Sequence, residues 1–455
     1  MRRTRLALAG AQTEVFESTH ERSHLFCSYA LSPFRQGEPC YALLWEGQTG
    51  AFYELDDRLH ILKHPSPLPF PGYKYSFLFN LADPSCPLGF WDLAAAGKLM
   101  SLASYSRRGA LTPDEAWIID QIFAAVVPPT TNKEQFRTSP YYNCGVTDPR
   151  FLELAGKFSD ALFDIFFTYA TDHLTKGYPL LIGGGCGLNC DWNTRWKQTG
   201  LFADVFVPPV ANDSGSAIGT AVEAQYYMDG CAKLSWDVYS GADFVWDSPA
   251  TGLLQERLDY TDLARDLASG RVTAWVQGRY EVGPRALGHR SLLAAPFRTE
   301  MRDRLNNIKQ REPYRPVAPV CLEEDAAELF GAEGTSPYML YLRNALVEGL
   351  PAVTHVDGSA RIQTVNASQH PELHTLLRAF KNLTGFGVLC NTSLNFPGRG
   401  FINRSSDLFR YVTQRGIEDV VVDGRRFTGA AGVTGQLRCD PQRSSNTQST
   451  VNATR

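Results

Sequence analysis

Apolar residues recur every three or four positions in residues 148–174 of this 455-residue chain. This spacing predicts a long amphipathic helix with one buried face. The apolar positions that carry it are Phe151, Leu154, Phe158, Leu162 and Phe166. The segment "THERSHLFCSYALSPF" has the same spacing, and its helix should end at Pro33. The pattern therefore predicts two helices in the first half of the chain, of which the longer is amphipathic.

Strand patterns lie between these helices. Residues 38–55 contain two β-rich runs around Gly47 and Gly50, which predicts a hairpin. The stretch "PLLIGGGCGLNCDWNTRW" begins as a strand, continues as a glycine turn and ends as a helix. Such alternation of strand and helix is typical of an α/β protein.

The chain is too long for one ordinary domain. Apolar periodicity weakens through residues 229–262, after which "VTAWVQG" begins a new strand. We therefore predict a first domain at residues 1–250 and a second at residues 251–432. Residues 433–455 lack apolar periodicity and are expected to be disordered.

Composition narrows the range of partners. The formal net charge is −4 with 20% charged residues, so no overall basic field would hold nucleic acid, and a small anion is the better fit. The ten cysteines include no CxxC pair, which indicates a reducing cytoplasm. No stretch approaches a membrane span, and the apolar run in "MRRTRLALAGA" is too short for a signal peptide. We expect a cytoplasmic protein without membrane or nucleic-acid partners.

The stretch "GRYEVGPRALGHRS" places three arginines in a segment interrupted by glycine and proline. Arginine binds phosphate through paired hydrogen bonds, and glycine lets backbone N–H groups approach the same oxygens. A solvated surface loop would account for this composition equally well. Further basic residues favour an anion site, because Lys309, Arg311 and Arg315 follow within one segment and Arg361 comes later.

The order of motifs along almost the whole chain resembles the O-carbamoyltransferases of the nodulation-factor and cephamycin type (NodU/CmcH), and "FPGRGFI" looks closer to the cephamycin-type branch. The motifs are "HERSH", "AAGKLMSLASY", "GGGCGLN", "NDSGSAIGTA", "GRYEVGPRALGHRS", "KQREPYRPVAPV", "SPYML", "HVDGSARIQTV" and "NTSLNFPGRGFI". The resemblance implies an α/β fold in both domains, the first like the sugar-kinase/actin-like ATPases and the second YrdC-like. In that family the second domain makes carbamoyladenylate from carbamoyl phosphate and ATP with Mg(II), and the first transfers the carbamoyl group to a hydroxyl.

The resemblance also implies roles for the basic residues. On matching positions, the cationic anchors for the reacting phosphates are Arg285, Lys309, Arg315 and Arg361, with Ser393 supplying a hydroxyl and Asn391 contacting the nucleotide. Arg279 and Arg290 lie in the stretch "GRYEVGPRALGHRS", residues 278–291, which we call the arginine loop. They fit this role less well. Either could instead form a structural ion pair with Glu281 or Asp303.

His20 and His24 are four residues apart, so on a helix both imidazoles can bind one metal ion. The chain has two more pairs at this spacing, at His60 with His64 and at His370 with His374. Both lie next to prolines, where we expect surface histidines. Only "HERSH" falls on the metal-binding helix of the family that the chain resembles.

The third metal ligand of that family matches Asp213, and the resemblance implies Fe(II). Two neutral imidazoles and one carboxylate leave coordination positions open, which suits Fe(II) among other divalent ions. The alternative is purely structural. In that case His20 makes a buried polar contact and Asp213 caps the helix that opens at "SGSAIG".

The glycine turn matches the adenosine-side motif of the family. We assign nucleotide contact to Gly183, Gly184, Gly185 and Asn189, although close packing of strand and helix also selects glycine. Lys98 matches a family position where it either reaches phosphate or holds its helix. Both roles remain open.

Members of this family usually have about a hundred residues before the histidine helix, which here starts close to Met1. We expect either a truncated chain, a partner chain, or a homodimer in which the second copy covers the gap. An ATP-dependent O-carbamoyltransferase with a small hydroxyl-bearing acceptor, a sugar or a secondary metabolite such as an antibiotic precursor, is the leading hypothesis. The alternatives are a catalytically incomplete protein that binds nucleotide and metal, and a tRNA threonylcarbamoylation enzyme.

Overall fold

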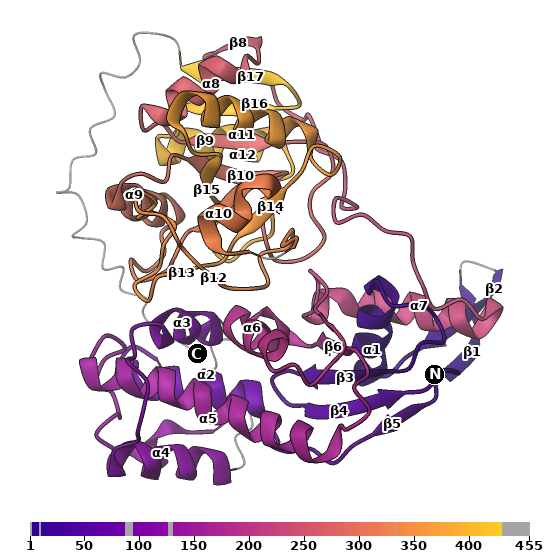
Figure 1. Ribbon diagram of the computed structural model, residues 1–455. Helices are drawn as coiled ribbons and strands as arrows, with labels where there is room; N and C mark the ends of the chain where they lie inside the picture. The colour runs from indigo at the N-terminus through magenta and orange to yellow at the C-terminus, as the bar shows by residue number, and fades with distance from the viewer. Residues whose placement is uncertain (1, 9–10, 87–93, 126–130, 333, 430–455) are drawn as a thin grey trace, which may run out of the picture.

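The computed structural model describes residues 2–8, 11–86, 94–125, 131–332 and 334–429. Two large sheets, one from each half of the chain, dominate the architecture, and helices cover both (Figure 1). The α/β fold class that the sequence indicates is confirmed by this mixed architecture. The tail predicted at residues 433–455 lies outside the described residues.

The first large sheet has five strands in the order β5-β4-β3-β6-β7. They are β3 (Cys40–Trp45), β4 (Gly50–Leu55), β5 (Ile61–Lys63), β6 (Leu180–Gly183) and β7 (Val205–Phe206). Strands β3 and β4 pair in antiparallel register as the predicted hairpin, whereas β3, β6 and β7 run parallel.

Helices cover both faces of this sheet, because side chains alternate between the faces along β3. Tyr41, Leu43 and Trp45 pack with residues of α2, α5 and α6, while Ala42 and Leu44 pack with α1 and α7. The helices of this half are α1 (His20–Leu31), α2 (Pro71–Ala82), α3 (Ala95–Ala103), α4 (Pro113–Ala124), α5 (Pro149–His173), α6 (Cys190–Gln198) and α7 (Ser216–Asp229). Both predicted helices are confirmed, as α1 and α5. Helix α5 has one buried face, whereas α1 is buried along its whole length from Ser23 to Leu31.

The second large sheet has eight strands in the order β14-β11-β15-β10-β9-β16-β17-β8. They are β8 (Leu253–Arg257), β9 (Thr273–Val276), β10 (Arg290–Ala294), β11 (Ala318–Leu322), β14 (Gln363–Val365), β15 (Val388–Ser393), β16 (Asp419–Val422) and β17 (Arg425–Gly429). The pairs β9/β16 and β11/β14 are parallel and the others antiparallel. The strand predicted at "VTAWVQG" is β9.

Five helices accompany this sheet: α8 (Tyr260–Ala268), α9 (Thr299–Lys309), α10 (Ala326–Phe330), α11 (Pro371–Thr384) and α12 (Ser405–Arg415). Residues of α8 and α11 share one apolar cluster with the sheet, and residues of α9, α10 and α12 share the cluster on the other face. Two small sheets complete the fold, the hairpin β1 (Arg2–Leu8) with β2 (Ala11–Glu17) and the pair β12 (Arg343–Asn344) with β13 (Ser359–Ala360).

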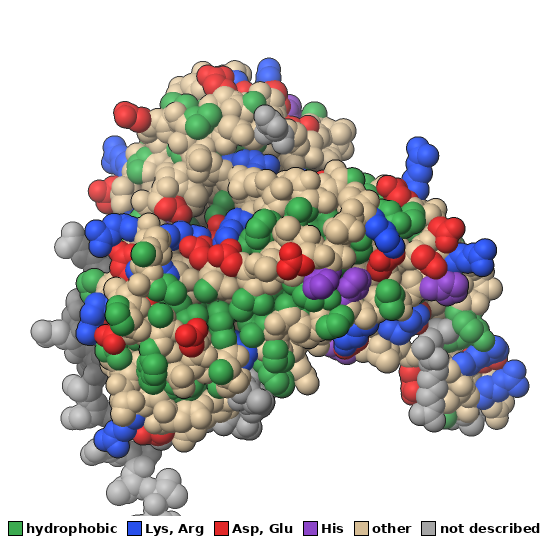
Figure 2. Space-filling view, turned by 60° about the horizontal axis from the view of Figure 1, so that its bottom comes forward, with side chains coloured by type: hydrophobic (Ala, Val, Ile, Leu, Met, Phe, Trp, Pro, Cys, Tyr) green, Lys and Arg blue, Asp and Glu red, His purple; other side chains and the backbone are tan. Residues whose placement is uncertain are grey.

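The two halves meet along α3 and α6 of the first and the segments around β12 and β13 of the second (Figure 1). Positive and negative side chains are interspersed on the face shown in Figure 2, including the seam between the two halves. None of the helices in the described part of the chain is both long and apolar enough to cross a membrane.

Candidate functional site

Helix α1 presents two histidines at its N-terminal end. Thr19 caps the helix, its hydroxyl accepting a hydrogen bond from the backbone N–H of Arg22 at 3.2 Å. His20 and His24 are one turn apart, and their ring centroids are 4.7 Å apart. The side chain of His20 is 52% exposed and that of His24 only 2%. The pair therefore has one wall in the core and one side open to solvent.

Asp213 reaches these histidines because α7 packs unusually close to α1. A Cβ on Gly219 of α7 would lie 1.7 Å from the backbone oxygen of Ser23, a distance that no side chain tolerates. The short turn η3 (Asp213–Gly215) precedes α7 and lies against α1. Asp213 Oδ1 is 3.2 Å from His24 Nε2 and 3.8 Å from His20 Nε2. The structure thus brings all three predicted metal ligands together.

Glu46 is a fourth donor, which the sequence interpretation missed. It follows β3 in the hairpin turn, and its Oε2 is 2.8 Å from His20 Nε2 and 3.4 Å from His24 Nε2. One ligand atom from each of the four residues fits within 4.8 Å of the others. The turn "WEGQTG", which follows β3, was the sequence signal that could have indicated this residue. Because β3 pairs with β6, the strand that leads into the glycine turn, the two turns lie at the same edge of the sheet.

Opposite charges in this group stabilise the charged forms of His24 and Glu46. Burial alone would lower the pKa of His24, but the hydrogen bonds and charges of Glu46 and Asp213 raise it. Burial raises the pKa of Glu46, and the two histidines outweigh that and lower it. Two imidazole nitrogens and two carboxylates can hold a divalent cation such as Fe(II), with room for further ligands on the exposed side.

We call His20, His24, Glu46 and Asp213 the metal-ligand group. The glycine turn, residues 183–189, runs from beside this group to the start of α6. Gly184 has a φ of +91°, and a Cβ there would lie 2.4 Å from the backbone oxygen of Trp45. A Cβ on Gly183 would lie 3.6 Å from that of His24, whereas one on Gly185 would meet nothing within 4 Å. The turn is therefore packed against β3 and α1 on one side and open on the other, where a ligand can approach its backbone.

Asn189 ends the turn and caps α6. Its side-chain oxygen accepts hydrogen bonds from the backbone N–H groups of Asp191 at 3.1 Å and Trp192 at 3.3 Å. Asn193 holds the turn from below, and its amide donates to the carbonyls of Gly187 at 2.8 Å and Leu340 at 3.0 Å. Since Leu340 belongs to the second half of the chain, Asn193 connects the glycine turn to that half.

The four predicted cationic anchors gather in the second half, together with Arg311. Burial and the charges of Arg361 and Arg315 lower the pKa of Arg285 to about 9. Burial together with Arg315 and Arg361 lowers the pKa of Arg311 to about 9. These side chains thus lie within electrostatic reach of one another. We call Arg285, Lys309, Arg311, Arg315 and Arg361 the cationic cluster.

Lys309 is the member of the cationic cluster whose lowered pKa lies nearest to neutral pH. Its side chain lies at the end of α9, and the residue is only 7% exposed. Burial and the charges of Arg311 and Arg315 lower its pKa to about 7. Like charges buried together cost free energy unless an anion accompanies them. A bound anion would therefore stabilise the charged form of the cationic cluster.

Two predicted residues support the cationic cluster. Lys309 Nζ donates to the carbonyls of Ser393 at 2.6 Å and Asn395 at 3.0 Å, so the end of β15 holds the lysine. The Ser393 hydroxyl donates to Asn395 Oδ1 at 2.6 Å. The Asn391 amide donates to Gln363 Oε1 at 2.8 Å and to the carbonyl of Ala286 at 3.2 Å. These contacts hold Lys309 against the end of β15 and Asn391 against the arginine loop.

The carboxylate of Glu281 holds the backbone of the arginine loop in place. Glu281 Oε1 accepts hydrogen bonds from the backbone N–H groups of Leu287, His289 and Arg290, at 2.7 to 3.1 Å. Arg290 is fully buried and donates to the carbonyls of Gln277, Gly278 and His289. The expected ion pair of Arg290 with Glu281 or Asp303 is therefore wrong, because backbone carbonyls satisfy its guanidinium instead.

His370 is also not the surface residue that the sequence predicts. It is 1% exposed and lies under the arginine loop, with Nε2 3.1 Å from the carbonyl oxygen of Gly288. Its Nδ1 accepts a hydrogen bond from the backbone N–H of Leu373 and caps α11. The adjacent proline indicated a helix start correctly, but the capping ring points inward rather than to solvent.

Contacts across the boundary bring the two groups of predicted residues together. Arg285 Nη2 donates to the carbonyl of Leu188 in the glycine turn at 3.1 Å. Lys98 Nζ lies 3.1 Å from Glu312 Oε1, and the Glu312 carboxylate is 3.8 Å from Arg315. The glycine turn and Lys98 of the first half therefore border the cationic cluster of the second.

Comparison with known proteins relates the chain to carbamoyltransferases. A family model described as "Carbamoyltransferase C-terminus" matches residues 264–428, and one described as "Carbamoyltransferase N-terminus" matches residues 170–222. The chain is 47% identical to 3'-hydroxymethylcephem-O-carbamoyltransferases of Amycolatopsis lactamdurans and Streptomyces clavuligerus, covering 93% of this chain and 82% of each relative. It is 36% identical to nodulation protein U of Sinorhizobium fredii, covering 84% of this chain and 73% of that protein.

Proposed function

The chain belongs to the carbamoyltransferase family, and we propose that it is an ATP-dependent O-carbamoyltransferase acting on a hydroxyl of a small molecule. The cationic cluster is the observation that carries the proposal. Carbamoyl phosphate and ATP both bring dense negative charge, and joining them requires cations where their phosphates meet. Arg285, Lys309, Arg315 and Arg361 would supply that charge, with Arg311 adding a fifth cation.

In this proposal the second half, residues 251–432, has a YrdC-like fold and makes carbamoyladenylate from carbamoyl phosphate and ATP, releasing pyrophosphate. The first half, residues 1–250, has a sugar-kinase/actin-like fold and supports transfer. The acceptor oxygen forms a bond to the carbamoyl carbon, the bond to AMP breaks, and the hydroxyl proton passes to a base.

The nucleotide would approach the open side of the glycine turn, at Gly183, Gly184, Gly185 and Asn189. Mg(II) would accompany the ATP phosphates, and Ser393, Asn391 and Lys98 border the same region. Fe(II) would be held by His20, His24 and Asp213, with Glu46 as a further ligand. A divalent ion there would supply Lewis acidity and an anchor for an anionic group.

Pyrophosphate release by the purified chain tests the adenylation step. We expect release that requires both ATP and carbamoyl phosphate, and we expect Arg285→Ala to lower its rate by about 10²–10³-fold, as for loss of one charge that stabilises a transition state. Arg378→Ala is the matched control, because this arginine is exposed on α11 and pairs only weakly with Glu324 at 3.5 Å. Equal rates in the wild type and Arg285→Ala would remove the proposed role of the cationic cluster.

A further inference from the structure

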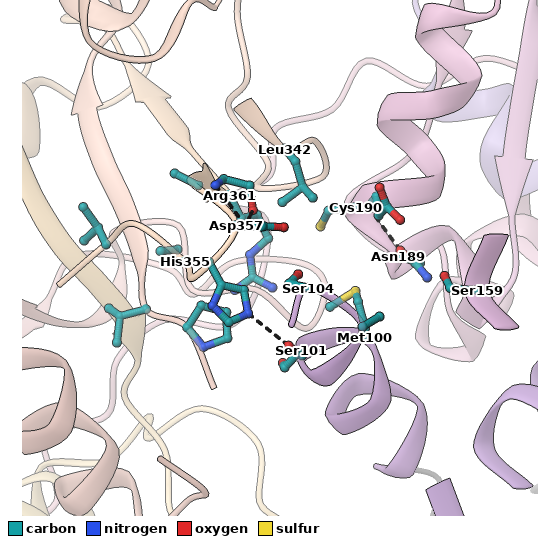
Figure 3. A pocket seen from close by; sticks show the side chains of 18 of the residues that line it. Met100, Ser101, Ser104, Ser159, Asn189, Cys190, Leu342, His355, Asp357 and Arg361 are labelled. Carbon is teal, nitrogen blue, oxygen red and sulfur yellow. Dashed lines mark hydrogen bonds between the residues drawn. The ribbon is translucent and has the colours of Figure 1, made fainter. Parts of the chain in front are cut away.

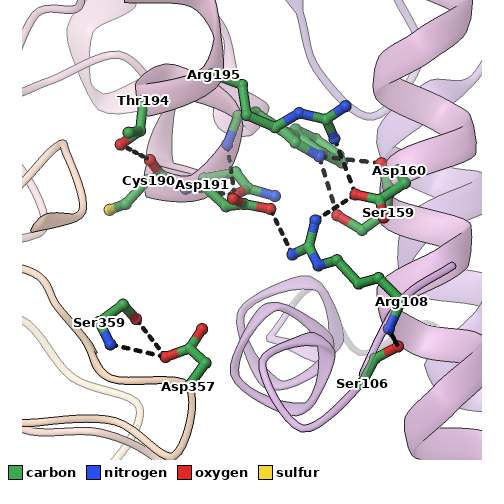
Figure 4. Close-up of polar contacts among 12 residues, drawn as sticks. Ser106, Arg108, Ser159, Asp160, Cys190, Asp191, Thr194, Arg195, Asp357 and Ser359 are labelled. Carbon is green, nitrogen blue, oxygen red and sulfur yellow. Dashed lines mark hydrogen bonds and ion pairs between the residues drawn. The ribbon is translucent and has the colours of Figure 1, made fainter. Parts of the chain in front are cut away.

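Arg285 lies at the junction of the two halves without an acidic partner among the residues that the structure describes. Another arginine at this junction shows the usual arrangement. Arg108 lines the cavity shown in Figure 3, and the carboxylates of Asp160 and Asp191 hold its guanidinium (Figure 4). Arg285 Nη2 instead donates to the carbonyl of Leu188 at 3.1 Å, and its Nε is buried without a partner in the described part of the chain. Contacts other than ion pairs must therefore hold Arg285.

The neighbouring positive charges oppose the position of Arg285. Arg361 and Arg315 are close enough to lower its pKa in addition to the effect of burial. Like charges repel most strongly where water is excluded, so a guanidinium on a flexible loop would turn toward solvent. A cation that is already in place stabilises negative charge on a ligand without a cost for moving there. The use of Arg285 in anion binding therefore depends on what holds its backbone.

The carbonyl of Leu287, two residues after Arg285, accepts hydrogen bonds from two side chains. The Tyr239 hydroxyl donates to it at 2.8 Å and the Gln363 amide at 2.7 Å. Tyr239 comes from the segment that connects the two halves, and Gln363 comes from β14. Leu287 is buried, and the two donors use both lone pairs of its carbonyl oxygen. They therefore fix a peptide group next to the residue that carries the cation.

The neighbouring carbonyls of the arginine loop are held in the same way. The carbonyl of Ala286 accepts a hydrogen bond from the Asn391 amide at 3.2 Å, and that of Gly288 accepts one from His370 Nε2 at 3.1 Å. Glu281 accepts the N–H groups of the same loop, as described above. The loop is therefore held through its carbonyls and its N–H groups alike.

Tyr239 is itself fixed against the arginine loop. Its ring stacks on that of His289, with the ring centroids 3.6 Å apart and the planes 13° apart. A backbone hydrogen bond from the N–H of Val282 to the carbonyl of Val238, at 2.7 Å, joins the connecting segment to the loop. Burial raises the pKa of Tyr239 well above its usual value, so its hydroxyl stays a donor at neutral pH. The segment between the halves therefore supports the arginine loop as well as connecting the two halves.

We propose that Tyr239 and Gln363 are positioning residues for anion binding. By holding the carbonyl of Leu287, they keep Arg285 in the cationic cluster against the repulsion of the other cations. The inference rests on the proposed function, because it takes the anion to be a phosphate group of a substrate. Neither positioning residue touches the anion, and both act through the loop.

A double-mutant cycle separates positioning from general support of the fold. The probe is sulfate, and its affinity is measured by calorimetric titration. We expect Tyr239→Phe, which removes only the hydroxyl, to weaken sulfate binding about three- to tenfold, the range for loss of one hydrogen bond. When Arg285 is already alanine, the same substitution should change the affinity by less than about twofold. Gln363→Met, which removes the second donor, should behave in the same way.

Tyr226→Phe is the matched control for the hydroxyl. Tyr226 on α7 also donates to a backbone carbonyl, that of Arg58 at 2.9 Å, but it lies outside the arginine loop. Its removal should leave the sulfate affinity within about twofold of the wild type. Thermal unfolding of every variant identifies those that do not fold.

The result in the Arg285→Ala background decides the assignment. An equal loss of affinity with and without Arg285 would overturn it, because a structural role acts in both backgrounds. Unchanged sulfate affinity in Tyr239→Phe or in Gln363→Met would overturn the role of that residue, and no sulfate binding by the wild type would overturn both. Pyrophosphate release by the wild type is measured in parallel. Its absence beside the expected sulfate cycle would remove the adenylation step and leave the positioning role standing.

Discussion

The metal-ligand group and the cationic cluster are built on opposite electrostatic principles. In the first, two imidazoles face two carboxylates. The carboxylates raise the pKa of His24, and the histidines lower the pKa of Glu46. In the second, like charges are buried together, and the pKa of Lys309 falls to about 7. Opposite charges stabilise a folded chain without any ligand, whereas like charges do so only with one. The cationic cluster is thus the stronger evidence for a bound molecule.

The two sites also differ in exposure and in origin. Asp213 is 78% exposed, whereas Lys309 is 7% exposed. The metal-ligand group comes from α1, a hairpin turn and η3, all within the first half. The cationic cluster joins the arginine loop, the end of α9 with the segment that follows it, and the turn between β13 and β14. It borders the glycine turn of the other half.

Among the effects that test this contrast between the two sites, we expect the largest to be the loss of Fe(II) affinity when one histidine is removed. We expect His24→Ala to lower the affinity for Fe(II) by more than about a hundredfold, because loss of a direct ligand costs more than the 10–100-fold typical of residues behind the ligands. The iron content of the protein, measured by elemental analysis after anaerobic loading, should fall from one per chain to near zero. Circular dichroism on the same samples should show that the secondary structure stays intact.

Two further variants make the metal experiment specific. His60→Ala is the matched control, because His60 also has a histidine four residues away but is exposed and pairs with Asp56 at 2.9 Å. Glu46→Gln keeps the shape of the side chain and removes its charge, so a partial loss of iron is expected. Full iron in His24→Ala would show that these residues have a structural role only, as in the alternative that the sequence left open.

The next largest expected effect is the pH dependence that the cationic cluster gives to the free energy of unfolding. The pKa of Lys309 falls from 10.5 to about 7 in the folded chain, so between these values the unfolded chain carries a proton that the folded chain lacks. The free energy of unfolding without ligand should therefore rise from pH 7 to pH 9, by up to about 1.4 kcal/mol per pH unit. Denaturant unfolding at both pH values measures this rise.

Anion binding should show the opposite slope. Sulfate keeps a constant charge over this range, and its affinity should fall by up to about tenfold per pH unit as Lys309 loses its proton. Calorimetric titration of the wild type and Lys309→Met at pH 6.5, 7.5 and 8.5 measures the slope. Lys309→Met should bind weakly and lose the part of the slope that Lys309 supplies. An equal slope in this variant would assign the pH dependence to another group.

Local patterns predicted most of the elements that position the sites. The spacing of apolar residues identified α1 and α5, and the glycine pattern identified the turn between β6 and α6. These features depend on neighbours in the sequence, so the sequence contains them directly. The motif order then indicated which basic residues gather, although they come from separate segments.

Long-range contacts were not predictable in the same way. Glu46 joins the metal-ligand group only because β3 and β6 are adjacent in the sheet. His370 is buried only because the arginine loop lies over it, and Arg290 is satisfied by carbonyls that the loop turns toward it. Each of these outcomes depends on how the chain returns on itself, which the spacing of residues does not contain.

The smallest effect is expected at Arg279, which shares the arginine loop with Arg285. Its guanidinium donates to the carbonyls of Gly241 at 2.6 Å and Ser240 at 2.9 Å, away from the cationic cluster. Arg279→Ala should therefore lower the free energy of unfolding by about 0.5–1.5 kcal/mol and change sulfate affinity by less than twofold. Arg285→Ala should weaken sulfate binding at least tenfold in the same titration. An equal loss in both variants would mean that the loop acts through its overall charge, and the contrast between an ion-paired group and a buried cationic cluster would then not explain anion binding.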